Sequence, residues 1–524
     1  MATSTLQAFE TTYTRKQVAF SLGSIFLAYL VYSYYVQTPG IAAPRIAADL
    51  DGMALYAWSV SIPGLGLAFG TILFGKLSDI YGRRFMLLLA LAILVGGAVA
   101  SALSPTFIFL IIARTALAIG QGAVAPIVFS VVGDIYPPAE RGKWIGLLNI
   151  PTGVFALTGP PLGGFLVDNL SWRHIFWWGI PLLAITIIAT AGMPALIQSV
   201  TKKIDFSGIA TVAVASTTLI LGLSFAGTTY PWGSVEVIGL LSVSALFWIL
   251  FLKAESKAEE PILDLKVLRN RIFLTASGAG FLSFFAITAM MVYYPLMLQG
   301  MQGVSATNSG YIVMPLGLLM SFFGVPVGFL ISRTKRYKWM YLVSYALLAA
   351  TMSGMVFYDS STPLIWGILA AIIGGIGFGS IPTINTLVIQ CAIPKRLLGV
   401  AMGALFFSIS MGVAIAPAIL GSAMNIQYNK TLKATLPAGL DQSSDEATMT
   451  SLGNPRVLLS DSAMASLKER LAPIGLLDET VQSIRSSMDA GLKAVFLIGA
   501  LAMLAALLLI LTIPEIPIDR VADE

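Results

Sequence analysis

Long apolar runs separated by short polar connections dominate this sequence. A helix needs about 20 residues to cross a bilayer, and we identify fourteen apolar runs of suitable length. They cover 18–38, 54–74, 85–103, 107–133, 143–167, 175–198, 206–226, 235–252, 272–298, 309–331, 339–358, 363–392, 398–424 and 491–513. The pattern therefore predicts an all-α polytopic membrane protein with fourteen transmembrane helices.

The composition supports lipid as the solvent of this chain. Charged residues make up 11% of the 524 positions, against roughly 25% in soluble domains, and the mean hydropathy is +0.85. A net charge of +5 would suggest a nucleic-acid partner in a soluble protein. Here an uneven distribution of charge across the membrane explains it better, and we expect no nucleic acid.

Basic residues are concentrated in alternate connections, which predicts the topology. One set of connections carries Lys76, Arg83, Arg84, Arg141, Lys143, Lys202, Lys203, Arg333, Lys335, Arg336, Lys338, Lys395 and Arg396. The opposite set carries little more than Arg45 and Arg173. Because basic loops stay on the cytoplasmic side, we expect a multi-pass protein of the cell membrane with both termini in the cytoplasm.

One connection, 425–490, is long and polar, and we expect it to be extracellular. It contains two candidate amphipathic helices, near 461–471 and 477–490. Asp461 and Asp478 are candidate N-caps. The simplest role for this segment is a solvated cover over the outer mouth.

The second half of the chain contains a degraded copy of the first. Gly328, Leu330, Ser332 and Arg336 repeat Gly75, Leu77, Asp79 and Arg83 at an offset of 253 positions, and Arg396 repeats Arg141. Gly403, Ala416, Pro417 and Gly421 likewise repeat Gly146, Gly159, Pro160 and Gly164. We expect a six-helix bundle over 1–200, an inserted helix pair over 201–260, and a second bundle over 261–524.

The connection 75–84, GKLSDIYGRR, resembles the loop between helices 2 and 3 of the major facilitator superfamily, G-x-L-x-D-x-x-G-R-R. Gly75 and Gly82 are expected to permit a tight turn. The resemblance implies the fold of that superfamily, two pseudo-symmetric six-helix bundles related as parallel repeats. The arrangement of six, two and six helices resembles its fourteen-helix drug:proton antiporter branch.

The same resemblance implies a conformational gate on the cytoplasmic side. Its expected members are Gly75, Asp79, Gly82, Arg83, Arg84, Asp134 and Arg141. Asp79 should meet the start of the helix near Leu398, where the helix dipole favours an anion, and Arg83 should pair with Asp134. Ser332 replaces the acid in the second copy, so we expect a one-sided gate.

A second motif lies in the fifth run, at Gly146, Gly159, Pro160, Gly163 and Gly164. Small residues permit close helix approach, and Pro160 permits a bend. The spacing resembles the antiporter signature G-x8-G-x3-G-P-x2-G-G, with Phe155 at its second glycine. Ordinary close packing is the alternative interpretation. WRHIFWWGIP at 172–181 and IDFSG at 204–208 also resemble this branch, with Gly179 in place of an asparagine.

Arg114 is the one clear cation inside an apolar run, and lipid would penalise it. We expect it to face the interior, near Tyr35 and Gln37 of the first run. At the position of Tyr35 the antiporter branch often has an acid, which this chain lacks. The candidate substrate-binding residues are Tyr32, Tyr35, Gln37, Arg114, Gln121, Asn149, Tyr293, Tyr294 and Asn385. A structural role for Arg114 remains open.

These features predict a secondary transporter that exports an amphipathic organic compound by alternating access, with protons as the candidate coupling ion. Aromatic and thioether side chains suit apolar ligands of variable shape. Because arginine cannot release a proton, the alternative is a lipid or organic-anion transporter of the same fold with weak or no proton coupling. A polytopic membrane enzyme is the rival of another class.

The sequence offers little chemistry for an enzyme or a cofactor. Its only histidine is His174 and its only cysteine is Cys391, so we expect no metal site and no cofactor. No G-x-x-x-x-G-K-[ST] loop is present, which excludes that kind of ATP site. We expect a monomer in the lipid bilayer whose ligand is a small molecule.

Overall fold

A computed structural model describes residues 14–52, 55–194, 205–227, 230–258, 261, 263–437, 452, 461–471 and 476–515. Helices dominate it. In the first half they are α2 (Arg15–Gln37), η1 (Pro39–Ala42), α3 (Ala43–Asp49), α4 (Tyr56–Tyr81), α5 (Arg83–Ala102), α6 (Phe107–Ile135), α7 (Pro138–Leu148), α8 (Ile150–Asn169) and α9 (Arg173–Ala191).

The remaining helices begin with the hairpin of α10 (Phe206–Phe225) and α11 (Val235–Lys257). They continue with α12 (Leu265–Arg269), α13 (Arg271–Thr288), η3 (Ala289–Tyr293), α14 (Tyr294–Gly300), α15 (Ala306–Phe322), α16 (Gly324–Thr334), α17 (Lys338–Met355), α18 (Leu364–Ala392), η4 (Lys395–Leu397), α19 (Leu398–Thr435), α22 (Asp461–Leu471) and α23 (Leu477–Leu511).

Polar residues start several of these apolar helices. Thr14 and Gln17 form a capping box at α2, and Thr106 caps α6. Asp205 and Asn270 cap α10 and α13 through their side-chain oxygens. Because lipid cannot hydrogen-bond the free N–H groups of a first turn, these caps help to set where each helix begins.

Eleven helices in the described part of the chain are long and apolar enough to cross a membrane, or twelve if the bent pair Pro138–Gly159 and Pro161–Asn169 is one span. The helices α4 and α17 occupy the positions of the second and eleventh predicted runs. The count of fourteen spans needs both of them, and it stays a prediction.

Two sequence-based boundaries were wrong. The expected turn at 75–84 is helical as far as Tyr81, and only Gly82 makes the turn, with φ 89°. The helix before the expected outer connection 425–490 does not end at 424, because α19 continues to Thr435, and α23 begins at Leu477, before the apolar run at 491. The length of an apolar run indicates how much of a helix the bilayer covers. The helix itself continues until its backbone hydrogen bonds are interrupted, so its ends can lie beyond the apolar run.

The candidate helix at 461–471 is present as α22 and begins at Asp461. The second candidate, 477–490, is the first part of α23. Asp478 lies in its first turn and is not the N-cap, which is Leu476 without a side-chain hydrogen bond. An acid in a first turn still interacts favourably with the helix dipole.

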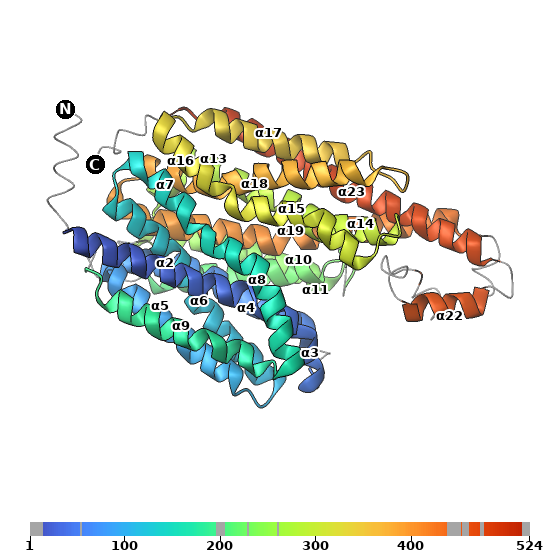
Figure 1. Ribbon diagram of the computed structural model, residues 1–524, viewed down its shortest axis with the longest axis horizontal. Coiled ribbons are helices and arrows are strands. Elements are labelled where there is room, and N and C mark those ends of the chain that lie inside the picture. Colours follow the sequence, from blue (N-terminus) through green and yellow to red (C-terminus); the bar gives the residue numbers. More distant parts are fainter. Residues whose placement is uncertain are drawn as a thin grey trace.

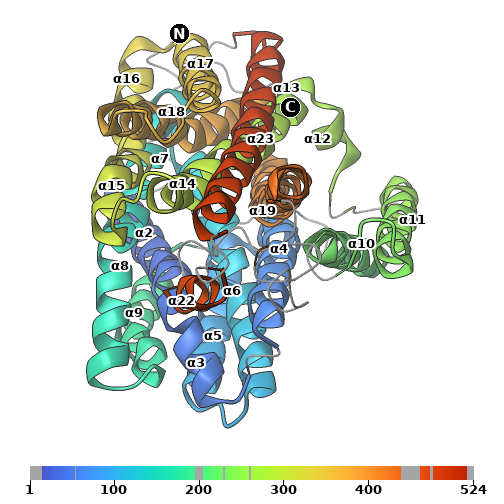
Figure 2. The same cartoon turned by 90° about the vertical axis from the view of Figure 1, so that its right-hand side faces the viewer.

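The helices form one elongated bundle, in which α2 begins and α23 ends at the same end (Figure 1). We call α2–α9 the N-terminal helices and α13–α23 the C-terminal helices. The most extensive contacts between these sets are those of α4 with α19 and of α7 with α16, and α6 also packs on α19, α8 on α15 and α7 on α18. The α10–α11 hairpin lies to one side, beside α4 and α19 (Figure 2).

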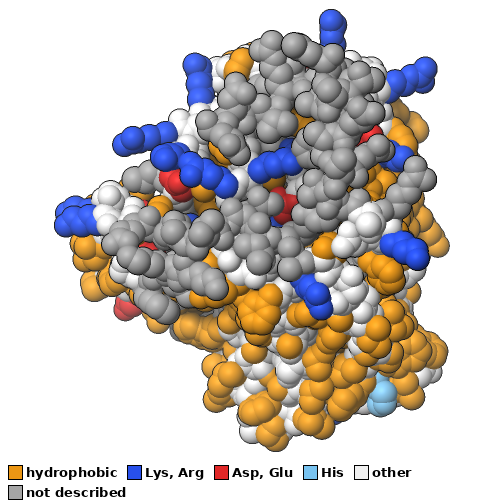
Figure 3. Space-filling view, turned by 90° about the vertical axis from the view of Figure 1, so that its left-hand side faces the viewer, with side chains coloured by type: hydrophobic (Ala, Val, Ile, Leu, Met, Phe, Trp, Pro, Cys, Tyr) orange, Lys and Arg blue, Asp and Glu red, His pale blue; other side chains and the backbone are white. Residues whose placement is uncertain are grey.

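The end of the bundle where α2 begins is basic. Figure 3 shows Lys and Arg side chains distributed around this face, above flanks that are mostly hydrophobic. Arg333, Arg336 and Arg396 are exposed there. We call it the basic end.

Candidate functional site

The turn between α4 and α5 organises the basic end. Gly82 has φ 89°, a left-handed conformation that strains any residue with a Cβ. It allows α5 to begin at Arg83, immediately after α4 ends at Tyr81. The tight connection places the Arg83 side chain of α5 beside Asp79 of α4, four residues earlier in the sequence.

Asp79 binds the first turn of α19. Its Oδ1 accepts the Gly399 N–H (3.0 Å) and its Oδ2 accepts the Val400 N–H (2.9 Å). Free N–H groups and the helix dipole make a helix start a favourable place for a carboxylate. The expected meeting of Asp79 with the helix near Leu398 is confirmed.

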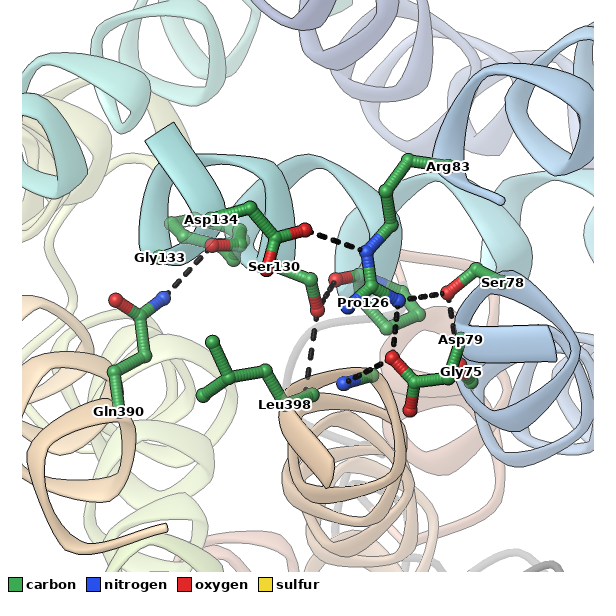
Figure 4. Close-up of polar contacts among 12 residues, drawn as sticks. Gly75, Ser78, Asp79, Arg83, Pro126, Ser130, Gly133, Asp134, Gln390 and Leu398 are labelled. Carbon is green, nitrogen blue, oxygen red and sulfur yellow. Dashed lines mark hydrogen bonds and ion pairs between the residues drawn. The ribbon is translucent and has the colours of Figure 1, made fainter. Parts of the chain in front are cut away.

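Arg83 is fully buried between two acids (Figure 4). Its Nη1 lies 2.6 Å from Asp79 Oδ1, and its Nε lies 2.9 Å from Asp134 Oδ2. Nη1 also donates to Ser78 Oγ (2.6 Å). The expected pair with Asp134 is therefore present. Removing one member of such a buried cluster leaves a charge without compensation, at a cost of about 3–5 kcal/mol.

Arg141 makes a second link between the two sets of helices. It donates to the carbonyls of Gln390 on α18 (2.9 Å), Gly133 (2.8 Å) and Tyr136 (2.9 Å). Gln390 in turn donates to the Phe129 carbonyl on α6 (2.7 Å). The sequence analysis missed Gln390, although it is a polar residue at the basic end of an apolar run. We call Asp79, Arg83, Asp134, Arg141 and Gln390 the lock.

An aromatic pair lies at the edge of the lock. Tyr136 stacks on Trp144, with ring centroids 5.0 Å apart. Burial, with Glu140 nearby, raises the pKa of Tyr136 to about 12. The phenol is therefore neutral near pH 7, and Arg141 uses only the backbone carbonyl of this residue. Arg84, the remaining expected gate residue, is partly exposed and lies outside the lock.

Glycines allow α4 and α19 to cross closely. A Cβ on Gly75 would lie 2.6 Å from the Gly399 carbonyl oxygen and 2.8 Å from the Gly403 Cα, closer than real atoms approach. Gly75 thus serves a helix crossing and not the turn. The predicted repeat has a counterpart between α7 and α16, where a Cβ on Gly146 would lie 2.7 Å from the Gly324 carbonyl oxygen.

The rest of the helix-packing motif lies in α8. A Cβ on Gly159 would lie 3.2 Å from the Gln37 Cβ, whereas Gly164 has nothing within 4 Å and Gly163 is buried. The helix bends by 41° between Pro138–Gly159 and Pro161–Asn169, at Pro160. The bend agrees with the sequence expectation, because proline removes a backbone hydrogen bond.

A cavity of about 530 Å³ lies between α2, α4, α6, α10 and α19. On α19 it begins at Phe406, eight residues beyond Leu398, and therefore roughly 12 Å from the start of that helix. Its polar side chains are Tyr32, Thr71, Ser224 and Ser410, and none of the described residues that line it is charged. The cavity and the lock thus share helices α4, α6 and α19 but occupy different levels.

Of the nine candidate substrate-binding residues, Tyr32 lines this cavity. The Tyr35 hydroxyl donates to the Phe176 carbonyl (3.0 Å). Arg114 donates to the Ser59 carbonyl of α4 (3.5 Å). Gln121 is buried next to Gly122, which does line the cavity.

The other candidates pack between helices. Asn149 donates to Thr383 Oγ1 (3.2 Å) across the two sets of helices, and Asn385 accepts a hydrogen bond from the Tyr341 hydroxyl. The Tyr293 hydroxyl lies beside Gly421, and Tyr294 packs its hydroxyl against Gly367. Gln37 is half-buried against α8.

Comparisons with known proteins agree with this geometry. Residues 25–417 match the family model described as Major Facilitator Superfamily. An uncharacterized MFS-type transporter of Mycobacterium tuberculosis is 33% identical over 76% of this chain and 58% of its own length. Multidrug resistance protein 3 of Bacillus subtilis is 27% identical over 92% of both chains. The solved structure of the proton:xylose symporter XylE superposes with a TM-score of 0.61 at 14% identity, covering 97% of this chain and 98% of its own.

The chain belongs to the major facilitator superfamily. Its fold is the all-helical membrane-embedded fold of that superfamily. The M. tuberculosis relative extends well beyond the matched region, since this chain spans 58% of its length.

Proposed function

We propose that this protein exports an amphipathic organic compound by alternating access, in exchange for protons. The observation that carries the proposal is the pairing of a cavity between helices with a buried polar lock on one side of it. A transporter needs such an arrangement, because a ligand must be closed off from one face while it is open to the other.

The basic end is proposed to face the cytoplasm, with both termini there. Its exposed arginines support this, since positively charged connections stay inside. In the conformation described here the hydrogen bonds and ion pairs of the lock are formed, so the proposed gate is closed and separates the cavity from the cytoplasm. A relative named for multidrug resistance supports outward transport of an organic compound.

The proposed gate comprises the lock together with Gly75, Gly82 and Arg84, and the proposed ligand contacts begin with Tyr32. The division into bundles over 1–200 and 261–524 with an inserted pair is part of this proposal, as is action as a monomer. The two glycine crossings support it, because each joins one N-terminal helix to one C-terminal helix.

A second candidate is an uncoupled or organic-anion carrier of the same fold. The lining of the cavity favours the uncoupled form, because no acidic side chain is among its described residues and a proton antiporter needs a group that binds and releases a proton.

Transport into sealed vesicles tests both candidates. The purified protein is reconstituted, and uptake of Nile red is measured with and without an imposed pH gradient. We expect uptake that rises several-fold when the gradient is applied. Equal uptake with and without the gradient would favour the uncoupled carrier, and no uptake of any tested compound would contradict the transport of amphipathic compounds.

A further inference from the structure

The α10–α11 hairpin is the part of the fold that a two-bundle transporter does not require. It packs against α4 of the N-terminal helices and α19 of the C-terminal helices (Figure 2). Its outer helix α11 exposes a long apolar surface that includes Val235, Ile238 and Leu246. Since an apolar exposed surface suits lipid, α11 faces the bilayer and α10 faces the protein.

The inner helix α10 forms a wall of the cavity. Ile220 and Ser224 both line it. They are four residues apart and therefore lie on the same face of α10. Ile220 is 4% exposed, so its side chain fills space between the hairpin and the bundle. Without α10 the cavity would be open to lipid on this side.

Aromatic contacts hold this wall to both sets of helices. Phe225 at the end of α10 packs edge-on against Trp58 of α4, with ring centroids 5.6 Å apart. Trp232 in the connection to α11 donates its indole N–H to Ser422 Oγ of α19. Gly227, with φ 72°, leaves room for this bond, because a Cβ there would lie 2.6 Å from Ser422 Oγ.

A further contact lies along α11, where Trp248 packs edge-on against Phe407 of α19 with centroids 6.2 Å apart. Phe407 directly follows Phe406, which lines the cavity. The hairpin is thus held near the level of the cavity as well as at its connection.

The chemistry of the lining defines the ligand class. The polar groups are hydroxyls, including Ser224 and Ser410, and the remaining surface is apolar. A charged ligand would lose its hydration here without gaining a counter-charge, which disfavours its binding. An uncharged amphipathic compound loses little, because hydroxyls can satisfy its few polar atoms.

We infer that the inserted hairpin is part of the substrate site, and that Ile220 and Ser224 of α10 help to select an uncharged amphipathic compound. This inference rests on the proposed function. It assigns α10 a role in specificity beyond packing against the bundle.

The test compares two bulky substitutions on the same helix. Ile220→Trp introduces an indole at the cavity wall, whereas Val214→Trp places it at a position that is 36% exposed. In reconstituted vesicles, Ile220→Trp is expected to lower uptake of Nile red about tenfold, and Val214→Trp to change it less than about twofold. The cation ethidium should be transported poorly by every variant. Normal Nile red uptake by a folded Ile220→Trp protein, or ethidium uptake equal to that of Nile red, would overturn the inference.

Ligand binding is measured separately through a cysteine. Cys391 is the only native cysteine, so Ser224→Cys in a Cys391→Ser background carries one thiol at the cavity. Nile red is expected to slow its reaction with a maleimide several-fold. An unchanged labelling rate would overturn the inference. Protection by Nile red in a protein that does not transport it would support the binding inference and contradict the proposed function.

Discussion

Asp79 and Val400 lie 321 residues apart in the sequence, yet the carboxylate of the first accepts the N–H of the second at 2.9 Å. The second half of the chain contains a neutral version of this contact. There Ser332, the counterpart of Asp79 in the repeat, accepts the Lys143 N–H at 3.1 Å. Both contacts join an N-terminal to a C-terminal helix, but only the first includes a buried ion pair.

The first prediction follows from this asymmetry. Asp79→Asn keeps a hydrogen-bond acceptor for α19 but removes the charge that compensates Arg83. We expect the variant to insert normally and to transport at least about tenfold more slowly, because Arg83 is left with one acid in a buried site. Arg83→Ala should be impaired to a similar degree.

Ser332→Ala is the matched control for this experiment. It removes the neutral contact, which is worth about 1 kcal/mol, so transport should fall less than about threefold. Transport rates of Asp79→Asn and Ser332→Ala in vesicles give the comparison. Equal effects of the two substitutions would show that the buried charge has no special role.

The second prediction concerns the crossing of α4 and α19. Gly75→Leu cannot be accommodated, because the Gly399 carbonyl and the Gly403 Cα occupy the position of its Cβ. We expect the lock to remain open, so that a cysteine at Thr71 in the cavity reacts with a maleimide applied from the basic end. Gly96→Leu is the control, since a Cβ on Gly96 would meet no described atom within 4 Å. The idea fails if both variants keep that cysteine unreactive.

The third prediction concerns topology. Lys433 is exposed near the end of α19, and Arg396 is exposed in η4, just before α19 begins. In intact cells of a Cys391→Ser background, Lys433→Cys should react with an impermeant maleimide, and Arg396→Cys should react only after permeabilisation. Reversed labelling would invert the assigned orientation, and labelling of both in intact cells would contradict the predicted crossing.

The fourth prediction separates two roles of Arg114. It donates to the Ser59 carbonyl of α4 and does not line the cavity. We expect Arg114→Lys to slow transport of neutral Nile red, because it weakens a link between α6 and α4, and we expect transport of anionic fluorescein to be poor before and after the substitution. A loss confined to fluorescein would instead assign Arg114 to an anionic substrate and favour the second candidate.

The lock could be predicted because the motif that carries it resembles the loop between helices 2 and 3 of the major facilitator superfamily, and that resemblance implies its pairings. A ten-residue motif contains both Asp79 and Arg83. Their distant partner Asp134 lies just before a connection with basic residues at the same end. Gln390 could not be found in the same way. A single amide at the end of an apolar run has many possible partners, and only the packing of α18 on α6 and α7 selects the Phe129 carbonyl.

The cavity was much harder to predict. Most of its lining consists of small and apolar residues such as Leu67 and Ala414, which also occur throughout every membrane helix. We chose polar and aromatic residues as candidates, but Tyr35 and Asn385 use their polar atoms to join helices. In a membrane interior, buried polar groups need partners within the protein, so many of them are structural.

Alternating access requires that the lock and the two glycine crossings, of α4 with α19 and of α7 with α16, open during each transport cycle. A reversible cross-link tests it most directly. A Cβ on Gly142 of α7 would lie 3.4 Å from Ser332 Oγ of α16, a separation compatible with a disulfide. The double variant Gly142→Cys/Ser332→Cys is prepared in the Cys391→Ser background, with each single variant as a control.

The measurement is Nile red uptake by this double variant in vesicles, before oxidation, after oxidation and after reduction. The account predicts uptake that falls to background on oxidation and recovers on reduction, while the single variants are unaffected. Undiminished uptake by the fully cross-linked protein would contradict the account.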